Sequence, residues 1–278
     1  MASGVRVSRE SLFSAMAELS GPQALREFVL DREIERLLDD RGVSIGRVQI
    51  EAERVRLVES IGGDLEGRDT LAEDVLSSRG LGPVRRESLL RRNAALRALV
   101  ADRVEVGEDA VALAHAIEHG ETRTVRVLIA RTVRDAVASR ERIAGRAQQT
   151  GLTAAFAEEA FARSIDQSSS LGGLLGEVSL LDPGITASLR SAIRDAEVGV
   201  IGPVIALDRA FALVLVERVV PADGTPLEAV RGRLEARVRA RAERLEMNRL
   251  AETLIGQAEI TPLDDSLRWA WDRSGAGG

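Results

Sequence analysis

The chain has 278 residues, of which 45% are hydrophobic and 29% charged, a composition typical of a folded globular protein of about two domains. Its formal net charge of −6 and its aromatic content of 3% argue against a nucleic-acid-binding protein, which needs basic patches and stacking side chains. The absence of cysteine excludes disulfides, thiolate metal sites and cysteine nucleophiles.

No apolar run in the sequence approaches the roughly 20 residues that span a bilayer. The first residues, 1–6, lack the apolar core of a signal peptide. We therefore expect either a protein that stays in the cytoplasm or one from which a signal was removed before this chain was made.

The first 120 residues carry helix signals and no strand signal. The spacing from Ser20 to Gln23 is that of a capping box, which predicts a helix starting there and ending near Gly42. Apolar residues at steps of three and four predict further helices at 44–62, 70–80, 84–100 and 108–117. The helix at 70–80 opens with a second capping box, Thr70–Glu73.

The pattern changes after residue 120. Alternating apolar residues predict a strand at 124–130, two helices follow and end near Ser164, and residues 164–184 have the composition of a loop. A short helix is expected at 186–194, and strands at 204–207 and 211–216. Residues 121–220 are therefore predicted to form a small α+β domain with an antiparallel sheet.

Helix returns at Thr225, where a capping box includes Pro226. The apolar pattern continues for about nine turns, which is too long for a stable helix without a packing partner. The natural partner is the N-terminal helical half. The predicted fold class is thus α+β, with a helical domain formed by both chain ends (1–120 and 221–278) and the small α+β domain (121–220) inserted between them.

The middle of the chain resembles a known family. Arg163–Glu177 is similar to the parvulin signature, in which a Ser two residues before a Cys or Asp leads into a Gly-Gly-Asp-Leu-Gly run. Gly202–Val204 resembles the Gly-Pro-Val before the last parvulin strand, and Phe156–Ala160 resembles the Phe-Ala-x-x-Ala of the preceding helix. These motifs follow the family's order between residues 124 and 218.

The flanking segments resemble the SurA- and PrsA-type foldases. Residues 40–44, Val104–Glu108 and the long helix from Thr225 are similar to the N-terminal and C-terminal parts of those proteins. The resemblance implies a chaperone-like helical body that carries a peptidyl-prolyl isomerase domain and is usually exported. It implies unfolded or proline-containing polypeptides as partners, and neither a cofactor nor a metal.

The resemblance also implies roles for single residues. Asp166 falls at the family's catalytic Cys/Asp position, and Ser164 at its supporting Ser. The family has two histidines near that position, whereas this chain has Arg126 at the first and Phe211 at the second. Leu174 stands where the family has the Asp of its Gly-Gly-Asp-Leu-Gly run.

Isomerisation needs a slot that grips the proline ring and polar groups that favour the twisted amide, because rotating a peptide bond faces a barrier of about 18–20 kcal/mol. By the same resemblance the substrate-binding residues are Leu128, Leu175, Val178, Ile185 and Leu189.

Asp166 has two interpretations: a turn residue in a polar loop, or a catalytic carboxyl. Without histidine partners it is expected either to become neutral on burial or to pair with Arg126. Gly172 and Gly173 indicate a backbone requirement rather than a phosphate cradle, since no P-loop pattern follows. The hypothesis is a peptidyl-prolyl isomerase and chaperone of weak or no isomerase activity, and the alternative is a non-enzymatic holdase.

Three further features remain. His115 and His119 have the spacing of half a metal site, but no third ligand is evident, so helix-surface residues are the preferred interpretation.

The arginine-rich run 231–244 is interleaved with Glu and indicates a salt-bridged face, with an acidic client or nucleic acid as the minority alternative. Trp269 and Trp271 either cap the helical core or form an exposed anchor for a partner.

Overall fold

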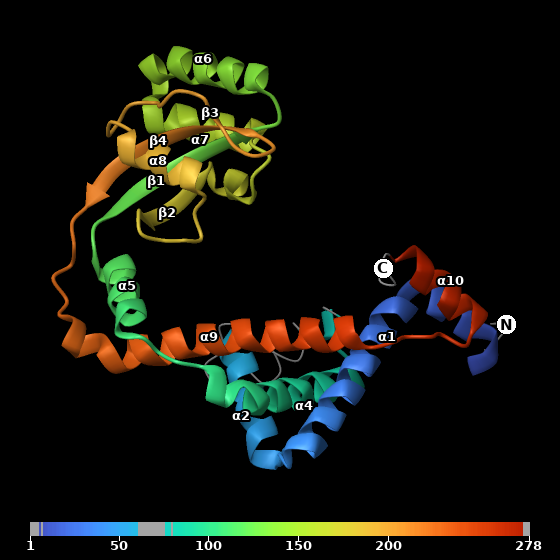
Figure 1. Cartoon of the computed structure of the whole chain (residues 1–278). Coiled ribbons are helices and arrows are strands. Elements are labelled where there is room, and N and C mark those ends of the chain that lie inside the picture. The colour runs from blue at the N-terminus through green and yellow to red at the C-terminus, as the bar shows by residue number, and fades with distance from the viewer. Residues whose placement is uncertain (1–5, 7, 61–75, 79, 275–278) are drawn as a thin grey trace, which may run out of the picture. The chain divides into compact units, whose positions relative to one another are not determined.

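The computed structural model describes residues 6, 8–60, 76–78 and 80–274. The chain divides into two compact units, Met1–Glu105 with Arg239–Gly278, which we call the helical unit, and Val106–Val238, which we call the sheet unit. Figure 1 shows their helices and strands. The predicted α+β class, with a helical body drawn from both chain ends and an inserted antiparallel sheet, is confirmed.

Among the residues that the structure describes, the helical unit consists of α-helices and a short turn of 3₁₀ helix. Its elements are α1 (Arg9–Arg41), α2 (Arg47–Ser60), α4 (Pro83–Val100), η1 (Ala101–Arg103), α10 (Asp265–Arg273) and the C-terminal part of α9 (Leu227–Gln257). In the part of the chain that the structure describes, no helix combines the length and apolar character needed to cross a membrane.

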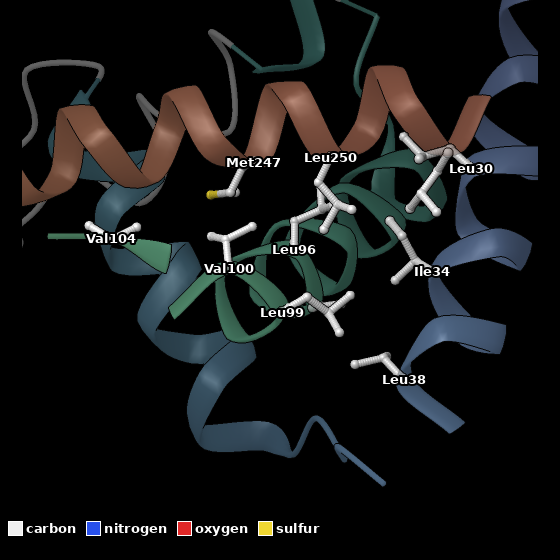
Figure 2. Packing of buried hydrophobic residues seen from close by; sticks show 11 residues of the cluster. Leu30, Ile34, Leu38, Leu96, Leu99, Val100, Val104, Met247 and Leu250 are labelled. Atoms are coloured by element: carbon white, nitrogen blue, oxygen red, sulfur yellow. The ribbon is translucent and has the colours of Figure 1, made fainter. Parts of the chain in front are cut away.

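The core of the helical unit joins both ends of the chain. Figure 2 shows Leu30, Ile34 and Leu38 of α1 and Leu99 of α4 converging with Leu250 of α9. Burying such large aliphatic side chains stabilises each helix far more than its intrinsic propensity does. The long C-terminal helix therefore has the N-terminal packing partner that its length required.

The expected helix start at Ser20 is wrong, because α1 begins at Arg9 and runs through Pro22 without ending. The Ser20 hydroxyl donates back to the Met16 carbonyl at 3.2 Å instead of capping a new helix. Gly21 lies against Leu267 of α10, so tertiary packing holds the helix together across the proline. The capping box Thr70–Glu73 lies outside the described residues.

The sheet unit begins with α5 (Glu108–His119) and contains four antiparallel strands in the order β2-β1-β4-β3. The strands are β1 (Thr122–Ala130), β2 (Leu174–Ser179), β3 (Ile205–Ala206) and β4 (Phe211–Val220). The two central strands, β1 and β4, are paired from Thr122 opposite Val220 to Ala130 opposite Phe211. Among the candidate site residues, Arg126 lies on β1 and Phe211 on β4.

Each face of the sheet has its own apolar core. On one face, α6 (Val133–Thr150) and α7 (Leu152–Arg163) cover a cluster around Leu128, Phe156 and Leu213. On the other face, α8 (Ala187–Asp195) packs on a cluster that includes Val127 and Ile193. Alternation along β1 sends neighbouring side chains into different cores, as period-two geometry requires.

The expected loop at 164–184 is wrong in part. It contains a 3₁₀ turn, η2 (Gln167–Leu171), and the edge strand β2, which pairs with β1. The strand sequence Leu-Leu-Gly-Glu-Val-Ser has a glycine in its interior and lacks a strand signal of its own. Its conformation is set by pairing with β1, which local sequence does not reveal.

Candidate functional site

The chain that leaves α7 is fastened to the end of β1 by Ser164. Its hydroxyl oxygen accepts hydrogen bonds from the backbone N–H of Ile129 at 3.0 Å and of Asp166 at 3.3 Å. The backbone N–H of Ile165 donates to the Ile129 carbonyl at 2.9 Å. The residue at the family's supporting Ser position thus holds a turn against the sheet.

Asp166 caps the 3₁₀ turn η2 that follows. Its Oδ2 accepts from the Ser168 backbone N–H at 2.9 Å and from the Ser168 hydroxyl at 2.5 Å. A carboxylate that accepts two such bonds is fixed in orientation. The turn-residue interpretation of Asp166 is therefore correct as local structure, and Ser168 is a partner that the sequence analysis missed.

Two glycines let this turn approach β1. Gly172 and Gly173 have φ of 64° and 78°, the left-handed region that favours glycine. A Cβ on Gly173 would lie 2.2 Å from the carbonyl oxygen of Val127, whose own N–H donates to the Gly173 carbonyl at 2.8 Å. The glycine pair meets a backbone requirement, as predicted.

Arg126 lies on β1 under the same turn. Its Nε donates to Oε1 of Glu217 at 2.5 Å, and its Nη1 donates to the carbonyls of Leu171 and Gly172 at 3.0 and 2.8 Å. Of the two alternatives for Asp166, the pairing with Arg126 is therefore wrong. Glu217 lies two residues along β4 from Leu215, the cross-strand partner of Arg126, and this register brings its carboxylate within reach of the guanidinium.

Phe211 stands at the start of β4, opposite Ala130, and packs into the core beneath α6 and α7. Arg126 is opposite Leu215, four residues further along β4. The structure therefore does not bring the two family histidine positions together. Neither position carries an imidazole.

The apolar candidates separate into three groups. Val178, Ile185 and Leu189 share the core under α8, with Ile185 and Leu189 half-buried at its edge. Leu128 is fully buried in the core on the opposite face of the sheet. Leu175 is 38% exposed on β2. Three of the five predicted slot residues therefore lie together.

Glu159 is a charged residue that the sequence analysis did not single out. Its side chain is 2% exposed between α6 and α7, with Arg142 at 2.6 Å and Ser139 donating at 2.9 Å. Burial alone would raise its pKa, but hydrogen bonds from Arg142 and Ser139 outweigh that effect and hold the pKa below its ordinary value. The only local signal was a Glu within the apolar face of α7.

The two histidines do not form a metal site with other described residues. Nε2 of His115 lies 2.8 Å from the Thr225 carbonyl, and Nδ1 of His119 lies 2.7 Å from Oδ2 of Asp223. The His119 hydrogen bond, assisted by Thr225, lowers the pKa of Asp223 to about 2. Both histidines fasten the 223–225 segment to α5.

The arginine-rich part of α9 is salt-bridged, as predicted. Arg231 pairs with Glu108 and Glu228, while Arg233 and Arg237 both pair with Glu118 of α5. These pairs lie within the sheet unit. They account for a large part of the basic run without an acidic client.

The two tryptophans differ in burial. Trp271 is 4% exposed and packs in the helical unit, with Arg26 over its ring at 5.8 Å. Trp269 is 52% exposed and carries Arg273 over its ring. The packing interpretation is therefore correct for Trp271.

No family model matches the chain, and no curated protein matches it. Among solved structures it is similar to the foldase PrsA from Streptococcus pneumoniae, at 14% identity and a TM-score of 0.44 over 98% of this chain and 97% of that one. It is also similar to the peptidylprolyl isomerase PrsA from Bacillus anthracis (15%, TM-score 0.42, 87% and 100%). A third neighbour is a SurA-like chaperone structure from Campylobacter jejuni (15%, TM-score 0.35, 80% and 97%). At these identities and TM-scores, none of the three neighbours decides the function of this chain.

Proposed function

We propose that this chain is a foldase that binds unfolded polypeptides and slowly isomerises X–Pro bonds through its sheet unit. The observation that carries the proposal is the turn of Ser164, Asp166, Gly172 and Gly173. These residues of the parvulin-like signature come together in one hydrogen-bonded turn against β1. Val178, Ile185 and Leu189 supply the apolar residues assigned to the proline slot.

The chemistry requires little of the protein. Exchange of an X–Pro bond takes roughly tens to hundreds of seconds unaided, because twisting the amide breaks its resonance. A site accelerates it by binding the twisted amide more tightly than either planar form, with no nucleophile or metal. The Asp166 carboxylate and the Ser168 hydroxyl are the polar groups that we assign to this task.

The same geometry argues for slow catalysis. Arg126 is committed to Glu217 and two carbonyls, and Phe211 to the apolar core. Neither position offers a group whose hydrogen bonding adjusts as the amide twists. We therefore expect acceleration well below that of a typical parvulin.

A non-enzymatic holdase is the second candidate, favoured by the same commitment of Arg126 and Phe211. In that case the sheet unit binds proline-containing segments without isomerising their X–Pro bonds. For either function we propose an extracytoplasmic location, since foldases of the type that the sequence resembles are usually exported.

The test is refolding of a protein whose slow phase is limited by X–Pro exchange, with suppression of client aggregation measured in parallel. The foldase should shorten the slow phase, and Asp166→Ala should remove that effect while leaving aggregation suppression intact. If the wild type suppresses aggregation but never shortens the slow phase, the holdase function replaces the proposal.

A further inference from the structure

The helical unit contains a cavity of about 340 Å³ between α2, α4 and α9. Its size falls near the lower end of the range for ligand pockets, roughly 300–1,000 Å³. Val48 at the start of α2 is 81% exposed on its rim, and Ala101 is exposed at the end of α4. The cavity is therefore reachable from solvent.

Small side chains on facing helices explain why the space is empty. Ala52 of α2 lines one wall, and Ala94, Ala98 and Ala101 line the other at steps of four and three residues. That spacing places the three alanines on one face of the helix that runs into η1. Methyl groups on both sides leave room that larger aliphatic residues would fill, and they make the walls apolar.

The lining of the cavity also carries charged side chains, and these pair with one another. Glu53 is 4% exposed and accepts from Arg97 at 2.6 and 3.2 Å and from Arg56 at 2.7 Å. Arg97 also pairs with Glu243 of α9. Two carboxylates and two guanidinium groups of the lining thus pair with one another, so the lining attracts neither an anion nor a cation.

We propose that this alanine-walled groove binds an uncharged apolar side chain, such as Leu, of an unfolded polypeptide. The choice of a polypeptide as partner rests on the proposed foldase function. The choice of an apolar, uncharged side chain rests on the alanine walls and the paired charges of the lining. The exposed Val48 adds a further apolar side chain where the lining meets solvent.

The test uses a fluorescein-labelled, proline-free nonapeptide of Ser and Gly with Leu at its centre, and the full chain. Ala98→Leu fills the groove and should weaken binding by about tenfold, the scale of excluding one Leu side chain. The matched control Ala240→Leu, at an exposed position on α9 within the helical unit, should bind as the wild type does. A peptide with Ser or Arg at the centre should bind weakly to all three proteins.

A thermal melt keeps the result interpretable. Filling an existing cavity should leave the unfolding midpoint unchanged or raise it. If Ala98→Leu fails to fold, Ala52→Leu on the opposite wall provides the same test. Equal binding by the filled variants and the wild type, or no binding by the wild type, would overturn the proposal.

Failure of this proposal is distinguishable from failure of the foldase function. Asp166→Ala lies in the sheet unit and should leave binding of the proline-free peptide unchanged. If the protein binds the peptide but does not accelerate X–Pro exchange, the isomerase function is refuted and the groove proposal stands. If it accelerates exchange but does not bind the peptide, the groove proposal is refuted and the isomerase function stands.

Discussion

The two halves of the candidate site differ in what they retain of the parvulin resemblance. The turn after α7 retains Ser164, Asp166 and the glycine pair, and hydrogen bonds or close packing hold each of them. The strand positions Arg126 and Phe211 carry no imidazole and serve an ion pair and the core. A motif can therefore keep its backbone architecture while the chemistry of its side chains changes.

The largest loss in unfolding free energy should come from Gly173→Ala, because it disturbs the close approach of the turn to β1. The added Cβ would meet the Val127 carbonyl oxygen at 2.2 Å in a backbone with φ of 78°. We expect a loss of about 3 kcal/mol in unfolding free energy, from strain and overpacking together. Urea denaturation measures it.

Gly176→Ala is the matched control. Its φ is 87°, but nothing lies within 4 Å of the added Cβ. It should lose only about 1 kcal/mol, from backbone strain alone. Equal losses at the two glycines would mean that the close approach to β1 contributes nothing.

Glu159→Gln should come next, because it leaves Arg142 and Arg146 without their buried carboxylate. The expected loss is roughly 2 kcal/mol at pH 7, against little for the exposed neighbour Glu158→Gln. The pKa of Glu159 is held below its ordinary value of 4.5, so its contribution is present above that pH. The difference in stability between wild type and variant should therefore shrink as the pH falls below 4.5. A difference that grows below pH 4.5 would contradict this prediction.

Arg126→Ala tests whether the first strand position is structural. Losing its charge-assisted bonds to Glu217 and to two carbonyls should cost about 1.5 kcal/mol. Exposed Arg131→Ala is the control. If Arg126→Ala abolished X–Pro acceleration at unchanged stability, Arg126 would take part in catalysis. The strand position would then not be merely structural.

The smallest stability effect should come from Asp166. Asp166→Ala removes the cap of η2 and should cost about 1 kcal/mol, whereas Asp166→Asn keeps a capping oxygen and should cost little. Chemical denaturation of both variants separates the cap from the charge. A larger loss for Asn than for Ala would show that the carboxylate is not a cap.

Much of the fold could be predicted from local signals. The helices α4, α6, α7, α8 and α9 follow from apolar periodicity, capping residues and proline positions, and β1 and β4 from dense β-branched and apolar runs. The edge strand β2 and the passage of α1 through Pro22 could not be predicted, because pairing with β1 and packing on α10 decide them.

The site was predictable to a smaller extent. Ser164, Asp166 and the glycine pair are contiguous, so their motif is readable in the sequence. The partner of Arg126 is Glu217, 91 residues further along the chain, and only the β1–β4 register brings the two together. For the same reason the sequence does not reveal that Leu128 enters a different core from Val178.

Slow catalysis by this chain is proposed to depend on Asp166. The most direct test is exchange spectroscopy of a short X–Pro peptide with the wild type, Asp166→Asn and Asp166→Ala at matched concentrations. We predict slight but measurable acceleration by the wild type and none by either variant, with all three folded. Acceleration typical of a parvulin, or acceleration that survives in both variants, would contradict the claim.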